Sequence, residues 1–242
     1  MKEIVGKKIT EKSRDTFFKM WQDIKKNVDS RVPDSSTDLI DEIILDERIE
    51  DFHWKIVLVG DGAVGKTSLR RRYLGESFSG NYQLTIGADF AVHEDKIGSK
   101  HVKFVIWDLA GQPRFHEVRS SFYRGCDGAM IVFDLTNPDS FKHLQYWMNE
   151  VWKNGTKGPV PFVVVANKAD LRDLGLSSIS DDVIKDFTTK LDKETRRRYS
   201  FGTKLIITSA KTGENVREAF KQLAIQLIAQ IRYLEKKQPS ES

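Results

Sequence analysis

Apolar residues occur along the chain in six short blocks, and longer stretches of mixed character separate them. Each block is bounded by turn-forming or charged residues, which predicts a strand, and the longer stretches repeat apolar residues every three or four positions, which predicts helices. The predicted strands span residues 54–59, 88–97, 101–108, 128–134, 160–166 and 204–208, and the main predicted helices span 67–74, 140–152, 181–199 and 214–234. This alternation indicates an α/β fold with a six-stranded, mostly parallel sheet and helices on both faces. Gly98 and Ser99 predict a tight turn, so the second and third strands form the one antiparallel pair.

A glycine-rich segment follows the first predicted strand and leads into the first predicted helix. It reads Gly60-Asp61-Gly62-Ala63-Val64-Gly65-Lys66-Thr67, followed by Ser68, and it fits the pattern G-x-x-x-x-G-K-[ST]. Glycines allow positive φ, so successive backbone N–H groups can point into one concavity and bind oxyanions. The helix N-terminus adds a partial positive charge. The sequence therefore predicts a nucleotide site in which Lys66 reaches the β- and γ-phosphates and the Thr67 hydroxyl binds Mg²⁺.

The third predicted strand leads into a second group of candidate residues. Asp108 stands at the carboxyl end of that strand, where open α/β sheets bind ligands, and its carboxylate can hold Mg²⁺ through a water. Gly111 can donate its backbone N–H to a γ-phosphate, because a chain without a Cβ can approach closely. Gln112 is then placed to orient an attacking water. Gln112, Gly111 and Lys66 are the predicted catalytic residues.

Two segments after later strands predict recognition of guanine. In Asn167-Lys168-Ala169-Asp170, the Asp170 carboxylate can accept two N–H bonds from the guanine edge, and adenine offers no such pair. The aliphatic stem of Lys168 can lie along the ring face. In Ser209-Ala210-Lys211, the Ala210 N–H can bond the guanine O6 atom and Ser209 can steady Asp170. Neither an ATPase nor a nucleotide kinase explains this pair of segments.

With these motifs the chain resembles the Ras superfamily of small GTPases, and the Rab branch most closely. The resemblance runs from about His53 to about Leu234. Its Rab-like segments are Thr85-Ile86-Gly87-Ala88-Asp89-Phe90, Ile106-Trp107-Asp108, Arg114-Phe115 and Phe122-Tyr123-Arg124-Gly125. The resemblance implies a P-loop NTPase G domain that binds GTP or GDP with Mg²⁺ and hydrolyses GTP slowly, as a molecular switch in membrane trafficking or signalling. It also implies a GTPase-activating protein, an exchange factor and effector proteins as partners.

The resemblance further implies roles for residues outside the main motifs. Thr85 is the threonine that closes on Mg²⁺ and the γ-phosphate in the GTP state. Phe78 takes the place of an aromatic residue against the guanine, and Tyr82 would lie over the phosphates. Gly62 and Ala63 occupy positions where bulkier side chains can obstruct hydrolysis.

The chain departs from the Rab pattern in two places. Pro113 follows Gln112 where Rab proteins usually carry Glu, and proline favours an extended preceding residue and has no N–H donor. A GTP-binding scaffold that barely hydrolyses GTP, and acts through an N-terminal arm, is therefore the alternative function. The second departure is an enlarged segment between Asp170 and Ser209, which contains Arg196-Arg197-Arg198.

The 242 residues suit one G domain at 53–235, with an N-terminal helical extension at 1–52 and a short polar tail at 236–242. The extension holds two apolar patterns of helical spacing. The first comprises Phe17, Trp21, Ile24 and Val28, and the second, which Thr37 can cap, comprises Leu39, Ile40, Ile43, Ile44 and Ile49. Neither helix is expected to be stable alone in water. The two helices can pack against the domain, touch an anionic membrane, or bind a partner.

Composition limits the remaining functions. Cys126 is the single cysteine, which excludes an internal disulfide, suits the cytoplasm, and is best explained as a small buried apolar residue. No apolar run reaches the length of a membrane span and the last residues hold no cysteine for prenylation, so any membrane contact is expected to be peripheral or indirect. The histidines lack metal-ligand spacing. The arginine runs at 70–72 and 196–198 are expected to be solvated helix faces, so nucleic acid is not an expected partner. We expect a monomer.

Overall fold

The computed structural model describes residues 43, 46–80, 84–172, 174–176, 179–198 and 202–237. The strands are β1 (Glu50–Val59), β2 (Ala88–Ile97), β3 (Lys100–Leu109), β4 (Gly128–Asp134), β5 (Phe162–Asn167) and β6 (Leu205–Ile207). The helices are α3 (Lys66–Tyr73), α4 (His116–Tyr123), α5 (Pro138–Lys142), α6 (Leu144–Asn154), α7 (Asp181–Arg198) and α8 (Val216–Lys237), with short 3-10 turns η2 (Pro113–Phe115) and η3 (Ala169–Leu171).

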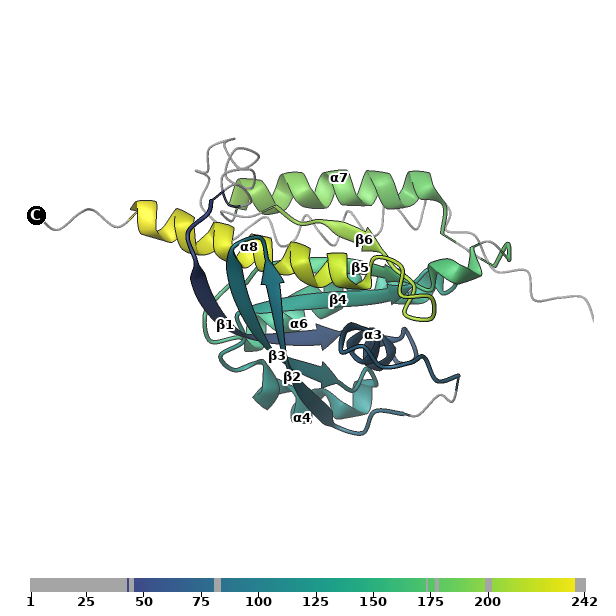
Figure 1. Cartoon of the computed structure of the whole chain (residues 1–242). Coiled ribbons are helices and arrows are strands. Elements are labelled where there is room, and N and C mark those ends of the chain that lie inside the picture. Colours follow the sequence, from purple (N-terminus) through teal and green to yellow (C-terminus); the bar gives the residue numbers. More distant parts are fainter. Residues whose placement is uncertain are drawn as a thin grey trace, which may run out of the picture.

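The six strands form one sheet in the order β2-β3-β1-β4-β5-β6 (Figure 1). β1 lies inside the sheet and pairs in parallel with both β3 and β4, and β5 and β6 continue the parallel order. Only β2 runs antiparallel, and it pairs with β3 across the turn at Gly98 and Ser99. The predicted fold class is therefore confirmed. The carboxyl ends of the parallel strands meet at one edge, which brings the predicted motifs together.

Alternate residues of β1 enter two different hydrophobic cores, because successive side chains of a strand point to opposite faces. Val57 and Val59 belong to a core that includes residues of α4, α6 and α7. Ile56 and Leu58 belong to a core that includes residues of α3 and α8. The last predicted helix repeats apolar residues at helical spacing, and of these Val216, Phe220, Leu223 and Leu227 are buried, while Ile231 packs partly buried against the same core. Burial of each such large side chain contributes about 2 kcal/mol, and together they hold the sheet rigid behind the loops.

Most element boundaries differ from the sequence prediction by one to three residues, and the largest differences concern β1 and the helix predicted at 140–152. β1 begins at Glu50 rather than residue 54, because Glu50 to Phe52 continue the parallel register against Lys100 to Val102. The Phe52 ring also stacks on Trp54 at 4.9 Å, which extends the apolar surface of the strand. The predicted helix at 140–152 is two helices, α5 and α6, which meet at His143. α5 starts earlier than predicted, because Asn137 caps it through the Asp139 N–H and Pro138 occupies its first turn.

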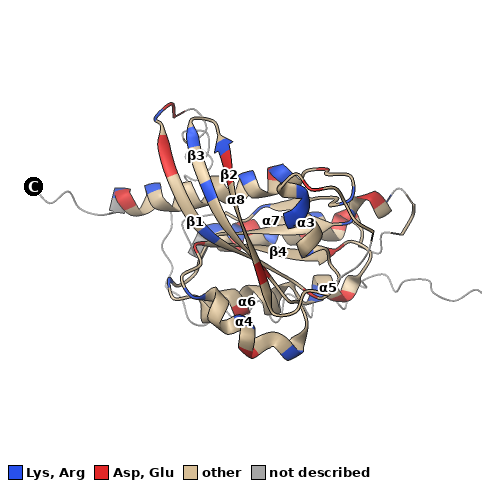
Figure 2. Ribbon diagram, turned by 60° about the horizontal axis from the view of Figure 1, so that its bottom comes forward, with Lys and Arg blue, Asp and Glu red and all other residues tan. Residues whose placement is uncertain are grey.

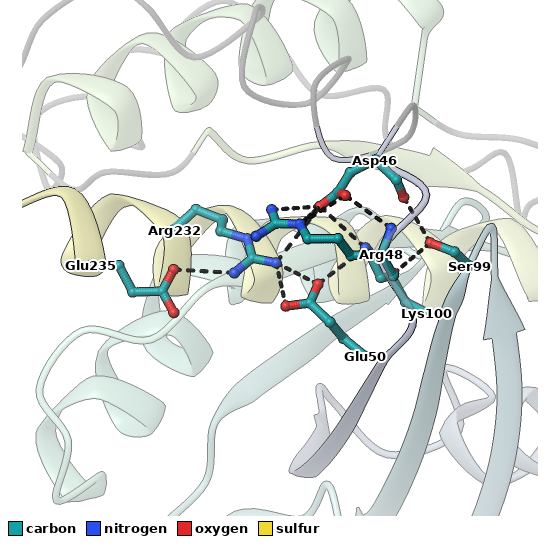
Figure 3. Close-up of polar contacts among 7 residues, drawn as sticks. All are labelled: Asp46, Arg48, Glu50, Ser99, Lys100, Arg232 and Glu235. Carbon is teal, nitrogen blue, oxygen red and sulfur yellow. Dashed lines mark hydrogen bonds and ion pairs between the residues drawn. The ribbon is translucent and has the colours of Figure 1, made fainter.

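A charged network joins the segment before β1 to the domain (Figure 3). Lys100 is almost fully buried, and its ammonium lies 3.0 Å from Glu50 and 3.2 Å from Asp46. Arg232 of α8 pairs with Glu50, and Ser99 donates to the Asp46 carbonyl at 2.7 Å. Arg48 holds the pKa of Asp46 well below its usual range. Figure 2 shows acidic residues of β1 beside basic residues of β3 at this end of the sheet.

The structure tests two of the apolar positions predicted for the second extension helix. Ile43 is helical and buried in the core that contains α8. Ile49 lies outside any helix and is 78% exposed, so its assignment to that helix is wrong. Its neighbours explain the difference, since Asp46 and Arg48 bond to the β2–β3 turn and draw the chain into an extended path. The other predicted extension positions lie outside the described residues.

Three further predictions can be compared with the structure. Cys126 is fully buried, as expected. The first arginine run is not a solvated face, because Arg70 is buried against Asp89 at 2.5 Å and Arg72 donates to the Ala210 carbonyl at 3.0 Å. In the enlarged segment, α7 packs Ile184, Phe187 and Leu191 into the core, and Arg196 pairs with Asp192. No helix of the described residues combines the length and apolar character needed to cross a membrane.

Candidate functional site

A cleft of about 540 Å³ opens where the loops after β1, β3, β5 and β6 meet. Residues of every predicted motif line it, namely Gly62, Ala63, Gly65, Lys66, Thr67, Ser68, Phe78, Thr85, Gly111, Gln112, Asn167, Lys168, Asp170, Ala210 and Lys211. The predicted residues Gly60, Asp61, Val64, Asp108 and Ser209 support this lining from behind. Tyr82 lies outside the described residues. The structure thus brings segments that are far apart in the sequence into one site.

The phosphate loop requires glycine at two positions. Gly60 has φ +141°, and a Cβ there would lie 2.1 Å from the Val132 carbonyl oxygen. Gly65 has φ +99°, and a Cβ there would lie 2.3 Å from the Asn167 amide nitrogen. Side chains are excluded at both positions, because the neighbouring atoms are backbone or a tightly bonded amide. The tight turn lets α3 begin directly at Lys66, with its N-terminus facing the cleft.

Lys66 is buried at the base of this loop. Its ammonium donates to the carbonyl oxygens of Gly60 at 2.8 Å and Asp61 at 2.7 Å. Burial lowers the pKa of Lys66 to about 8, although the nearby Asp108 and Asp61 carboxylates oppose the shift. A cation kept away from water is stabilised by an anion in the adjoining cleft. Lys66 is therefore suited to a phosphate group.

Three oxygen-bearing side chains from three segments converge behind the loop. The Thr67 hydroxyl lies 2.8 Å from the Thr85 hydroxyl and donates to Asp108 Oδ2 at 2.5 Å. The other Asp108 oxygen is buried and accepts no hydrogen bond from the described residues. Burial raises the pKa of Asp108, and its bond with Thr67 and the charge of Lys66 oppose that shift. Two hydroxyls and a carboxylate with an unused oxygen fit Mg²⁺, which prefers oxygen ligands.

The segment after β3 touches the phosphate loop directly. A Cβ on Gly111 would lie 2.4 Å from both the Gly60 oxygen and the Asp61 carbonyl carbon, so the two backbones are in close contact. Gln112 has φ −85° and ψ 142°, the extended conformation expected before Pro113. Its amide side chain reaches the cleft beside Gly62, and its Oε1 atom is buried without a hydrogen-bond partner among the described residues.

At the end of the cleft where the sequence predicts base binding, Asp170 and Lys168 are held from behind. The Ser209 hydroxyl donates to Asp170 Oδ1 at 2.6 Å, the contact that the sequence predicts. The Lys168 ammonium pairs with Asp134 at 2.6 Å, which leaves the Lys168 stem against the cleft. Phe78 lines the same cleft and is partly exposed.

Asn167 joins the two ends of the site. Its amide nitrogen donates to the Val64 carbonyl at 2.9 Å, and its oxygen accepts the Ala210 N–H at 3.1 Å. The Ala210 N–H predicted to bond guanine thus has a protein partner in this structure. The phosphate loop and the two base segments form one hydrogen-bonded unit through this side chain.

Sequence reasoning missed several residues that hold the site in place. The Asp61 carboxylate turns away from the cleft, accepts the Trp147 indole N–H at 2.8 Å and bonds His143 at 2.7 Å. Arg119 binds the backbone on both sides of Gly111. Trp147, His143 and Arg119 lie on or beside helices α4 and α6, outside every motif. Their signal in the sequence was only a tryptophan and an arginine within otherwise amphipathic stretches.

A glycine-rich G-x-x-x-x-G-K-[ST] loop that shares one cleft with the segments Asn167–Asp170 and Ser209–Lys211 is typical of a guanine-nucleotide-binding G domain of the P-loop class. The family model for the Ras family matches residues 55–229, which is more than half of the chain. The chain belongs to the Ras family.

Individual relatives give the same result. The chain is 36% identical over 174 residues to the Ras-related protein Rab-13 of Mesocricetus auratus, covering 72% of this chain and 79% of that protein. It is 36% identical over 177 residues to the GTP-binding protein ypt1 of Schizosaccharomyces pombe, with 73% and 81% covered. It is 37% identical over 174 residues to the Ras-related protein Rab-1D of Dictyostelium discoideum, with 72% and 79% covered. The predicted Rab-like kinship is confirmed, and the chain is a GTP-binding switch protein that hydrolyses GTP.

Proposed function

We propose that the chain alternates between GTP- and GDP-bound forms with Mg²⁺, and that the segment carrying Thr85 reports which nucleotide is bound. One observation carries this proposal: the Thr85 hydroxyl lies 2.8 Å from the Thr67 hydroxyl at the candidate metal ligands. Thr67 belongs to the rigid start of α3, whereas Thr85 belongs to the loop between α3 and β2. A metal and γ-phosphate at this point favour the closed loop, and loss of the γ-phosphate releases it.

Each candidate residue then has a defined task. Residues 60–68 cradle the phosphates, and Lys66 contacts the β- and γ-phosphates. Thr67, Thr85 and Asp108 would hold Mg²⁺, with Asp108 acting directly or through a water. When bound, Mg²⁺ neutralises charge on the phosphate oxygens. Gly111 donates its N–H to the γ-phosphate and Gln112 orients the attacking water.

The base end discriminates guanine from adenine. Asp170 accepts the two N–H groups of the guanine edge, while Phe78 and the Lys168 stem flank the ring. Because Ser209 already donates to Asp170, the carboxylate is held in one orientation before the base arrives. Tyr82 and Lys211 complete the predicted nucleotide contacts.

Exposed apolar side chains lie just before β2, on β2 and on α4, and they suit effector proteins of the kind the family uses. Ile86 is 76% exposed and Phe90 is 57% exposed, and Val92 and Val118 are also exposed. This surface lies next to the segment whose position depends on the nucleotide, so an effector bound there senses the switch. We assign the chain to regulation of membrane trafficking, as a cytoplasmic monomer with at most peripheral membrane contact, and expect a GTPase-activating protein and an exchange factor as its regulators.

Single-turnover hydrolysis of bound GTP in the presence of Mg²⁺ tests the proposal. We expect slow turnover, competition for the site by GDP but not by excess ATP, and slower turnover with unchanged GTP affinity for Gln112→Leu. Tight GTP binding with no turnover would favour the scaffold alternative. Unchanged turnover of Gln112→Leu would remove Gln112 from the mechanism.

A further inference from the structure

Arg119 is fully buried in α4, and buried arginines are rare unless every donor is paired. Its Nε donates to Glu150 Oε1 at 2.7 Å and its Nη2 donates to Glu150 Oε2 at 3.0 Å. Glu150 lies on α6 and is itself buried, and it accepts a third bond from the Tyr123 hydroxyl at 2.8 Å. Burial acts to raise the pKa of Glu150, but its bonds with Arg119 and with two tyrosines hold that pKa below its ordinary value. The pair is therefore ionised and fixed in a bidentate geometry.

The remaining side of the Arg119 guanidinium holds residues 110–113, called here the hydrolysis segment because they include the predicted catalytic residues Gly111 and Gln112. Nη1 donates to the Ala110 carbonyl at 3.0 Å and to the Gln112 carbonyl at 2.7 Å. These carbonyls flank Gly111, so one charged group fixes the backbone on both sides of the glycine that touches the phosphate loop. Arg119 is not among the residues that line the cleft, so it acts on the site through the backbone.

Helix α6, which carries Glu150, also holds the phosphate loop. The Arg119 guanidinium lies over the Trp147 ring, 4.7 Å from its centre. The Trp147 indole N–H donates to the Asp61 carboxylate at 2.8 Å. Helix α6 therefore supports both parts of the site: Trp147 bonds the phosphate loop directly, and Glu150 holds Arg119, which bonds the Gln112 backbone.

The hydrolysis segment has few other restraints. Pro113 has no N–H to donate, and the Gln112 side-chain oxygen accepts no hydrogen bond from the residues described. The backbone bonds around it are Ala110 N–H to Gly87 and Phe115 N–H to the Gln112 carbonyl. Among the described residues, the Gln112 carbonyl thus accepts a hydrogen bond from outside its own turn only from Arg119.

We propose that Arg119, held by Glu150, is a positioning residue for GTP hydrolysis that sets the place of the Gln112 side chain through its backbone carbonyl. This inference rests on the proposed role of Gln112. Lysine at this position can reach Glu150 or the carbonyls, but its single ammonium cannot reproduce the fork that binds both. Displacement of Gln112 by a fraction of an ångström then slows the chemical step without altering nucleotide binding.

A double-mutant cycle on the full chain tests the inference, with Arg119→Lys, Gln112→Leu and the double variant compared in single-turnover GTP hydrolysis. We expect Arg119→Lys to lower the rate about tenfold and to change GDP affinity less than about twofold. In the Gln112→Leu background, Arg119→Lys should have no further effect, because its partner in the mechanism is already absent. Arg232→Lys is the matched control, since Arg232 is also a largely buried arginine paired with a glutamate and is not among the residues that line the cleft. Its rate should equal that of the parent.

The outcomes separate the two proposals. If Gln112→Leu is slowed and Arg119→Lys is not, Arg119 has no positioning role while the proposed function survives. If Arg119→Lys slows both backgrounds equally, its effect does not pass through Gln112 and the inference is wrong. If Gln112→Leu keeps the parent rate, the role of Gln112 and this inference fall together. Should Arg119→Lys not fold, Glu150→Gln enters the same cycle, because it removes the carboxylate fork with little change in volume, and the same results are expected.

Discussion

Replacement of Gly111 by alanine tests how the hydrolysis segment meets the phosphate loop. A Cβ at this position would lie 2.4 Å from the Gly60 carbonyl oxygen and 2.4 Å from the Asp61 carbonyl carbon. Both neighbours are backbone atoms, and the Lys66 ammonium bonds both carbonyls. They cannot turn aside as a flexible side chain could, so the segment that carries Gln112 has to move.

The size of the movement follows from the contact distances. Ordinary contact begins at 3.4 Å, so the two backbones must separate by about 3.4 − 2.4 = 1.0 Å. A displacement of about 1 Å at a catalytic group can slow a reaction by about 100-fold, which corresponds to about 2.7 kcal/mol of activation free energy. GDP affinity should change less than about threefold, because the segment that carries Gln112 moves while residues 60–68, which carry the proposed diphosphate contacts, stay in place.

The assay is single-turnover hydrolysis of bound GTP with Mg²⁺, beside a GDP titration. Gly80→Ala is the matched control, since a Cβ there would meet no atom within 4 Å and the backbone at Gly80 is not in the left-handed region. The control should hydrolyse GTP within about threefold of the parent rate. The reasoning is refuted if Gly111→Ala also hydrolyses within that range, or if it loses GDP affinity as strongly as rate.

Three other predictions concern the base, the cysteine and the charged network. Asp170→Asn should weaken GTP binding by about 100-fold or more, since two hydrogen bonds to a charge are lost. The variant should favour xanthosine triphosphate, because its 2-oxo group accepts a hydrogen bond where guanine donates one. An equal loss of affinity for both nucleotides in competition binding would contradict this assignment. Burial raises the pKa of the Cys126 thiol to about 11, so a thiol reagent should react with it at pH 8 only after denaturation, and rapid labelling of the native protein would disprove burial. The unfolded thiol ionises at lower pH than the folded one, so this group makes the free energy of unfolding fall as pH rises from 9 towards 11. Lys100→Met should lower the melting temperature by about 5 °C, because Asp46 and Glu50 lose a buried cation. Lys103→Met on the same strand removes only an exposed pair and should change the melting temperature by less than about 1 °C. Equal shifts for the two variants would mean that the network adds no stability.

The fold was predictable because its signals are local. Most strands of this sheet are short apolar blocks, and glycine at positions 60 and 65 marks a turn that can bind phosphates. The motif residues stand at the carboxyl ends of strands, and a parallel sheet brings those ends together whatever the packing details. Even the extended conformation of Gln112 could be read from Pro113, since the clash that causes it involves adjacent residues.

The remainder depends on contacts between residues distant in the sequence. Arg119 and Glu150 are separated by 31 positions, and nothing near either residue indicates that the two form a buried pair. The early start of β1 at Glu50 depends on pairing with Lys100, and the exposure of Ile49 depends on the same network. A pattern of apolar spacing cannot contain this information, because it reports the face of an element and not its partner.

The motif residues line the cleft, and the residues that no motif predicted, such as Arg119 and Trp147, support them from behind. Residues that face the nucleotide must have one chemical identity, so short patterns reveal them. The residues behind them need only reach a backbone carbonyl or a carboxylate from a rigid element, and many sequences can satisfy that need. Asn167 stands between the two groups: it lies in the base motif, yet its side chain bonds Val64 and Ala210. Its presence in the motif is therefore explained by the geometry it imposes on the phosphate loop as well as by any contact with the base, because a shift of either end would separate the phosphates from Asp170.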